Sequence, residues 1–200
     1  MARAGTYAKG TARREEILQS AMQILAKDGY RNTSLRQIAR ELGVEPAHIL
    51  YYFTSREELL QKVVERWDED NAAQRGGEAL SPPYALDSFV EVVRRNMEMP
   101  GLVHLYLTFA AEAVHPDHAA HDYFQQRFRG VQTLLVLAIQ HEKSTGRIRA
   151  DMDVEAEARK LIALSDGLQL QALVDPSVDP AAILADAVSA LRAEHVLASS

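Results

Sequence analysis

The sequence lacks cysteine altogether and has few aromatic residues, which make up 6% of its 200 residues. The absence of cysteine excludes disulfide frameworks, cysteine-ligated zinc, iron–sulfur clusters and thiol nucleophiles. The sequence also lacks any apolar run approaching the ~18 residues that span a bilayer, so we expect no membrane partner. The basic N-terminus is not followed by the apolar segment of a secretory signal, and we therefore expect a cytoplasmic protein.

Alternating runs of β-branched residues, the usual signature of strands, are also missing. Apolar residues instead recur at helical spacing along segments rich in Ala, Leu, Glu, Gln and Arg, which predicts an all-α protein. We expect a compact helical head joined to a larger helical bundle. The head has expected helices at about 11–28, 34–42 and 46–53 and a longer one capped by Ser55. The bundle has them at about 84–97, 101–114, 117–142, 153–174 and 180–196.

Positive charge is scarce overall but concentrated at one end. The net charge is −6, yet residues 1–56 contain nine Lys and Arg against five Asp and Glu. This segment therefore carries +4, which leaves −10 for residues 57–200. A basic end on an acidic body is typical of a chain whose one end meets phosphate, although tails often carry positive charge without such a partner.

Two short predicted helices in the head have the proportions of a helix-turn-helix. Ser34 is positioned to cap the first helix, with Thr33 as the other possible cap, and Gly43 ends it. Pro46 suits the first turn of the second helix, where no N–H is needed. Helix pairs of this shape also occur as plain packing units, so spacing and charge alone leave DNA binding and simple packing both open.

The head also carries a specific residue pattern. Residues 33–44 read Thr-Ser-Leu-Arg-Gln-Ile-Ala-Arg-Glu-Leu-Gly-Val, and residues 51–60 read Tyr-Tyr-Phe-Thr-Ser-Arg-Glu-Glu-Leu-Leu. This order of residues resembles the DNA-binding domain of the TetR family. The stretch from Gly146 to Leu168 is similar, more loosely, to the carboxy-terminal part of BetI-type members.

The resemblance implies an architecture and a function. It implies a flexible basic arm at residues 1–10, a three-helix helix-turn-helix DNA-binding domain at 11–56, and a helical bundle for ligand binding and dimerisation at 57–200. Members of this family are homodimeric, ligand-responsive transcriptional regulators, usually repressors released by a small-molecule effector. Two-fold symmetry predicts a palindromic operator with half-site centres about 34–36 Å, or a multiple, apart. The alternative is a helical small-molecule carrier or adaptor that never touches DNA.

In such a domain the second short helix enters the major groove of double-stranded DNA. His48 can then donate to a guanine acceptor and Ala47 can touch a thymine methyl, whereas Tyr52 would anchor a phosphate. A hydroxyl at the start of the preceding helix would bind another phosphate. The full set of expected DNA-binding residues is Thr33, Ser34, Arg36, Pro46, Ala47, His48, Tyr51, Tyr52 and Arg56.

Two residues depart from the family pattern. Glu45 stands where the family prefers a serine or threonine cap. A carboxylate there is repelled by phosphate, unless it accepts from a cytosine amino group or points away. Leu50 replaces the frequent first tyrosine of the recognition helix, which removes one expected phosphate contact.

A small-molecule effector needs an apolar pocket with a few convergent polar groups. The apolar faces of the helices at 101–114 and 117–142 are suited to line it, and His104, Thr108 and Glu112 share one helix face. Each of these residues could equally belong to the core or, for the polar face, to a solvated stripe. The candidate effector-binding residues are Trp67, Met97, His104, Tyr106, Thr108, Phe109, Phe124, Phe128 and Asp166.

The resemblance assigns homodimerisation to the last two helices. The apolar residues that could face the partner copy are Leu161, Leu164, Leu168, Val174, Ile183, Leu184, Ala187, Val188 and Leu191.

A group of histidines looks at first like a metal site; its members are His115, Asp117, His118 and His121. Their spacing matches no standard site, and no nucleophile–base pair accompanies them. We therefore expect no metal, no cofactor and no enzymatic activity.

Overall fold

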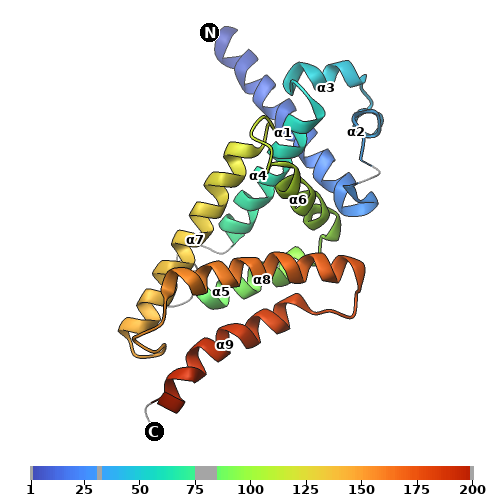
Figure 1. Cartoon of the computed structure of the whole chain (residues 1–200). Coiled ribbons are helices and arrows are strands. Elements are labelled where there is room, and N and C mark those ends of the chain that lie inside the picture. The colour runs from blue at the N-terminus through green and yellow to red at the C-terminus, as the bar shows by residue number, and fades with distance from the viewer. Residues whose placement is uncertain (1, 31–32, 75–84, 199–200) are drawn as a thin grey trace. The chain divides into compact units, whose positions relative to one another are not determined.

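The computed structural model describes residues 2–30, 33–74 and 85–198, and these residues form nine α-helices (Figure 1). No strand occurs in these ranges, which confirms the predicted all-α class. The helices are α1 Ala2–Asp28, α2 Leu35–Glu41, α3 Pro46–Tyr52, α4 Arg56–Gln74, α5 Ala85–Asn96, α6 Pro100–Glu112, α7 His121–Ser144, α8 Val154–Val174 and α9 Pro180–Ala198. None of the described helices is both long and apolar enough to cross a membrane.

The chain divides into two compact units that do not follow the order of the sequence. The first unit contains the described residues up to Glu69 together with Met99–His121, and so combines α1 to α3 and most of α4 with α6. The second contains Asp70–Glu98 and the described residues from Asp122 onward, with α5, α7, α8 and α9. Most of α4, which begins at Arg56, therefore lies in the same unit as the helix-turn-helix, and so does α6.

Helix α1 begins at Ala2, so the expected start at Thr11 is wrong. Alanine, lysine and arginine in the first residues favour helix, and here they outweigh the two glycines that favour a break. The helix ends at Asp28 as predicted, because Gly29 adopts a left-handed φ of +77° and its N–H donates to the Leu25 carbonyl at 3.0 Å.

Helices α2 and α3 form the predicted helix-turn-helix. Ser34 caps α2 by accepting a hydrogen bond from the N–H of Gln37 at 3.2 Å. Gly43 then turns the chain with a φ of +63°. Ile38 of α2 and Ile49 of α3 are buried, so one side of each helix is fixed in the core of the unit.

Helix α4 begins with the predicted cap at Ser55. The Ser55 hydroxyl oxygen accepts from the Glu58 N–H at 3.0 Å, and the Glu58 carboxylate accepts from both the N–H and the hydroxyl of Thr54 at 2.6 Å. The bonds from Thr54 lower the pKa of Glu58 because they favour the ionised carboxylate, and the charges of Arg14 and Lys62 add to this effect. This reciprocal arrangement stabilises the first turn of α4.

Within the first unit, α6 packs closely against α1. A β-carbon added to Gly101 would lie only 1.9 Å from the Leu25 carbonyl oxygen, so this approach requires glycine. Tyr30 follows α1, and its ring makes edge contacts with His104 and Phe109 of α6 at centroid distances of 5.5 and 6.2 Å. The end of α1 is therefore held by α6, a helix distant in the sequence.

The core of the second unit is built by α5, α7, α8 and α9. Helix α9 packs against α5 and α8, and Figure 1 shows α9 turning back along α8 after the short connection between them. The side chains of this core with at most 1% exposure are those of Leu86, Val93, Ala138, Ile139, Ile148, Ala158, Leu184 and Val188.

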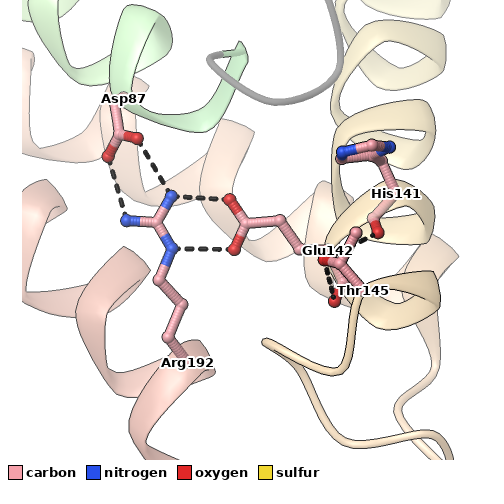
Figure 2. Close-up of polar contacts among 5 residues, drawn as sticks. All are labelled: Asp87, His141, Glu142, Thr145 and Arg192. Carbon is pink, nitrogen blue, oxygen red and sulfur yellow. Dashed lines mark hydrogen bonds and ion pairs between the residues drawn. The ribbon is translucent and has the colours of Figure 1, made fainter.

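The second unit also holds one completely buried carboxylate. Both oxygens of Glu142 in α7 accept hydrogen bonds from Arg192 of α9, at 2.6 and 2.7 Å (Figure 2). The same guanidinium donates to Asp87 of α5 at 3.0 and 3.1 Å. Hydrogen bonds to Glu142 and then to Asp87 raise the pKa of Arg192, and the three side chains connect three helices.

A chain of buried amides forms a second polar connection. The Asn71 amide N–H donates to Asn96 Oδ1 at 3.3 Å, and the Asn96 amide N–H donates to Gln169 Oε1 at 3.0 Å. Gln169 Nε2 then donates to the Ser165 carbonyl at 3.1 Å. The chain joins α4, α5 and α8, and isolated Asn and Gln residues in the sequence gave no signal for it.

Candidate nucleic-acid interface

Helix α3 turns one side to the core and the other to solvent. Ile49 is fully buried, whereas Tyr51 is 81% exposed and Leu50 is 44% exposed. Ala47 and His48 are exposed as well. The structure therefore brings the expected reading residues of α3 together on one surface.

Three rings of this surface contact one another. The rings of His48 and Tyr52 meet edge to face at a centroid distance of 5.4 Å, and those of Tyr51 and Tyr52 do so at 5.1 Å. Such edge contacts are favourable and restrict how the rings can turn. His48 and Tyr51 remain exposed, so the polar atoms at the tips of their rings can reach a partner.

The two hydroxyls expected to meet phosphate lie in different surroundings. Thr33 is only 2% exposed, and its hydroxyl donates to the Gly29 carbonyl at 2.9 Å. The expectation that Thr33 binds a phosphate does not suit this position, because the hydroxyl closes the turn after α1. Ser34 is exposed at the start of α2, where its oxygen also caps the helix.

Arg56, expected to anchor a phosphate, is engaged within the protein. Its Nε and Nη2 atoms donate to the Thr33 carbonyl at 3.3 and 3.0 Å, and its guanidinium carbon lies 5.4 Å from the centre of the Tyr30 ring. Arg56 therefore fixes the segment before α2 to the start of α4. Arg14 of α1, absent from the expected set, lies over the Phe53 ring at 4.6 Å in the same way.

Charged side chains are exposed on α2 and directly before α3. Arg36 of α2 is exposed, as its expected phosphate contact requires, and so is Arg40, one turn further along. Glu45 precedes α3, is exposed and makes no capping hydrogen bond. Pro46 occupies the first turn of α3 and is half-buried. The departure at Glu45 thus leaves α3 without a side-chain cap.

The candidate effector residues divide between the two units. In the first unit three are buried and two half-buried: Trp67, Tyr106 and Phe109, then His104 and Thr108. The contacts of His104 and Phe109 with Tyr30 give both a packing role between α6 and the end of α1. Trp67 is different, because its buried indole N–H has no hydrogen-bond partner, which is uncommon in a folded protein.

In the second unit Phe124 is buried, and Met97, Phe128 and Asp166 are half-buried. The rings of Phe124 and Phe128 lie 6.2 Å apart, and the Tyr123 ring meets Phe124 at 5.2 Å. These contacts are compatible with either a pocket wall or a core, so the assignment of this group to an effector stays a prediction.

The last two helices expose an apolar surface that includes two of the expected dimer residues, Val174 and Ile183, and adds Leu170. Five of the expected dimer residues pack inside the second unit: Leu161, Leu168, Leu184, Val188 and Leu191. Leu170 and Val174 of α8 and Ile183 of α9 are exposed, Val174 by 82%. An open groove of about 550 Å³ lies between α8 and α9. The spacing of apolar residues predicts an apolar helix here but does not show which of its faces packs into the core. Leu170 is for that reason absent from the expected dimer residues.

The histidine-rich turn between α6 and α7 is held by ordinary contacts. His121 Nδ1 lies 2.7 Å from the Ala113 carbonyl oxygen, and the Ala120 N–H donates to His118 Nδ1 at 3.2 Å. His118 Nε2 lies 3.6 Å from the Glu112 carboxylate. In the described part of the chain, no three His, Asp or Glu side chains are grouped to hold a metal ion.

The helix-turn-helix and the exposed face of α3 define the class of helix-turn-helix DNA-binding regulators. Residues 17–63 match the family described as bacterial regulatory proteins, tetR family. Residues 85–196 match a second family, described as the C-terminal part of BetI-type transcriptional repressors. The chain therefore belongs to the TetR family, as the resemblance predicted, and is a ligand-responsive DNA-binding transcriptional regulator.

A curated relative supports this assignment, and solved structures share the fold. HTH-type transcriptional regulator PksA of Bacillus subtilis (strain 168) is 31% identical over 171 residues, which cover 82% of this chain and 80% of that protein. A TetR transcription regulator from Haloarcula marismortui ATCC 43049 superposes with a TM-score of 0.77 at 23% identity, covering 92% and 98% of the two chains. A transcriptional regulator from Saccharomonospora viridis, solved in complex with choline, gives 0.67 at 22% identity, covering 90% and 95%. The family and these relatives are regulators, not enzymes.

Proposed function

We propose that the protein is a homodimeric repressor that binds a palindromic operator through α3 of each copy and leaves it when a small-molecule effector binds. The observation that carries this proposal is the exposed face of α3, where Leu50 and Tyr51 are uncovered although the neighbouring Ile49 is fully buried. Exposed large apolar side chains mark interaction sites. For the recognition helix of a helix-turn-helix, that partner is the major groove of DNA.

Each exposed side chain of the interface has a proposed role. His48 donates to a guanine acceptor in the groove, and Tyr51, which is 81% exposed, reaches towards the base edges. Ser34 and Arg36, both exposed on α2, contact phosphates and set the position of α3. Arg56 acts chiefly by holding the Thr33 carbonyl, with its Nη1 donors directed to a phosphate.

The proposed dimer contact lies on the exposed side of α8 and α9. Ala163, Gly167, Leu170 and Val174 follow one another along α8 at steps of four, three and four residues, and therefore share one face. Two-fold symmetry lets this face meet the same face of a second copy. Two recognition helices would then reach half-sites about 34–36 Å, or a multiple, apart.

For the effector, the unpartnered Trp67 indole N–H is the proposed hydrogen-bond donor in the first unit. An acceptor atom of the effector would relieve a penalty of about 1–3 kcal/mol, which makes effector binding favourable there. Choline, bound by the Saccharomonospora viridis neighbour, is the first compound to test. An effector that lowers operator affinity by about 5–150-fold corresponds to the usual range of coupling between two sites.

Selection of a random duplex library on the purified protein tests the proposal, followed by a salt titration of the selected site. The expected result is a palindrome whose affinity falls steeply as salt rises, because phosphate contacts release counterions. Compounds are then added to this complex, and a true effector and the operator must weaken each other by the same factor. If no sequence is enriched at low salt and micromolar protein, the proposal that α3 of each copy reads a palindromic operator is wrong.

A further inference from the structure

The exposed face of α3 has one entirely apolar side. Successive helical residues are rotated by about 100°, so Ala47 lies almost opposite the buried Ile49, and Leu50 lies beside Ala47 on one flank. Pro46, one turn before Leu50, lies on the same flank. These three side chains, Pro46, Ala47 and Leu50, are here called the apolar flank, and they offer a partner no hydrogen-bonding group.

The opposite flank of α3 carries side chains that can form hydrogen bonds. His48 and Tyr52 lie there and meet edge to face, while Tyr51 projects between the flanks and leans towards Tyr52. The rings are thus gathered on the hydrogen-bonding side. On the other flank, Leu50 is 44% exposed and therefore open to a partner.

We infer that the apolar flank reads the 5-methyl groups of thymine, with Leu50 as the residue that determines this preference. The inference rests on the proposed binding of α3 in the major groove. The thymine methyl is the apolar group that base pairs present in that groove, whereas the other groove-facing atoms are hydrogen-bond donors or acceptors. Leu50 therefore replaces a hydrogen-bonding contact of the family pattern with a contact that selects sequence.

The size of the effect follows from the methyl group itself. Burying one methyl stabilises a complex by an amount that corresponds to about a 4-fold change in affinity. A two-fold dimer buries the group once in each half-site, so removing both methyls is expected to weaken binding by about 15-fold. Base contacts of this kind change specificity, whereas a phosphate contact would weaken all sequences alike.

Replacement of thymine by deoxyuridine tests the inference, because it removes only the methyl. Each thymine of the selected palindrome is replaced in both half-sites, and the affinity of the full-length protein is measured by fluorescence anisotropy. We expect at least one position where deoxyuridine weakens wild-type binding by about 15-fold. At that position Leu50→Ala should bind the two duplexes almost equally, while Leu50→Met, which retains an apolar side chain, should keep most of the difference.

The matched control is Leu137→Ala, which truncates a leucine of similar exposure, 49%, on α7 and should leave the thymine-to-deoxyuridine ratio unchanged. If the wild type binds the palindrome but ignores deoxyuridine at every position, or if Leu50→Ala retains the full ratio, the inference is wrong and the proposed function stands. If the wild type selects no sequence at all, the proposed function is wrong and the inference falls with it. Thermal melts of the variants should agree with wild type, since Leu50 is half exposed.

Discussion

At the scale of the residue, the turn between α1 and α2 shows how a side chain expected at the DNA surface serves the interior. The Thr33 hydroxyl donates a hydrogen bond to the Gly29 carbonyl, and the Thr33 carbonyl accepts hydrogen bonds from Arg56. Both interactions fix the start of α2, and with it the position of Ser34. The proposed phosphate contact of Ser34 is thus positioned by Thr33, whose hydroxyl is bonded inside the protein.

Glu58 gives a pH-dependent prediction at this scale. Its pKa in the fold lies below the ordinary value of 4.5, chiefly because Thr54 hydrogen-bonds the carboxylate. A carboxylate whose pKa is lowered in the fold stabilises the folded state fully when the pH is above its ordinary pKa. This contribution is lost as the pH falls through the pKa of the folded state. We expect urea unfolding to show a difference between wild type and Glu58→Gln that is largest near neutral pH and shrinks towards acid. A difference that grows on acidification would contradict this reading.

Asn96 carries a second prediction, since it is the middle link of the buried amide chain. Asn96→Leu leaves the amide N–H of Asn71 and Oε1 of Gln169 without their present partners. Each unpaired buried group costs about 1–3 kcal/mol, so the free energy of unfolding should fall by about 2–5 kcal/mol. Urea denaturation measures the change. The double variant Asn96→Leu with Gln169→Leu should recover part of the loss, and no recovery would mean that the amides do not act as one chain.

At the scale of the element, the decisive contact is the docking of α6 on α1. Gly101→Ala would place a β-carbon 1.9 Å from a backbone oxygen of Leu25, so one of the helices must move. We expect a loss of about 1–3 kcal/mol in unfolding free energy and weaker operator binding, because α1 supports α2 and α3. The matched control is Gly130→Ala in α7, where nothing lies within 4 Å and the same change should stabilise the protein by about 0.5–1 kcal/mol. Equal effects of the two substitutions in thermal melts would contradict the role of Gly101.

Helix ends were predictable where a side chain or a glycine marks them, as Ser34, Ser55 and Gly29 do. The start of α1 was not, because good helix formers and glycines compete in the first residues and their balance is small. The choice of face on α8 was not predictable either. That helix has apolar residues on more than one side, so Leu170 becomes exposed only once its neighbours in space are known.

The reading residues of α3 could be found from the sequence because the motif fixes their order. Their supporting contacts could not. Arg56 and Thr33 lie 23 residues apart, and the bond between them depends on how α4 returns to the start of α2. Gly101 shows the same limit, since Pro-Gly in a sequence indicates a turn and says nothing of a helix packed against it.

At the scale of the whole molecule, the proposed dimer makes a direct prediction. Leu170→Glu puts two like charges into the two-fold contact of α8, where juxtaposed charges cost several kcal/mol, so dimerisation should weaken by about 100-fold or more. Sedimentation velocity at several protein concentrations measures it. Leu137→Glu, which changes a leucine of similar exposure on α7, should remain dimeric. If Leu170→Glu does not weaken the dimer, the two copies must meet through another surface.

The docking of α6 also has a consequence for the exchange of DNA-binding units between regulators. The piece that folds around the helix-turn-helix is not contiguous in the chain, because Met99–His121 belongs to it. A chimera joined after α3 or α4 would carry a foreign α6 opposite the Leu25 carbonyl and the Tyr30 ring. Such a graft would need glycine at the position of Gly101 and a ring-compatible surface at His104 and Phe109. A transplant of the whole unit therefore has three junctions in the gene, one within α4 and one on either side of α6.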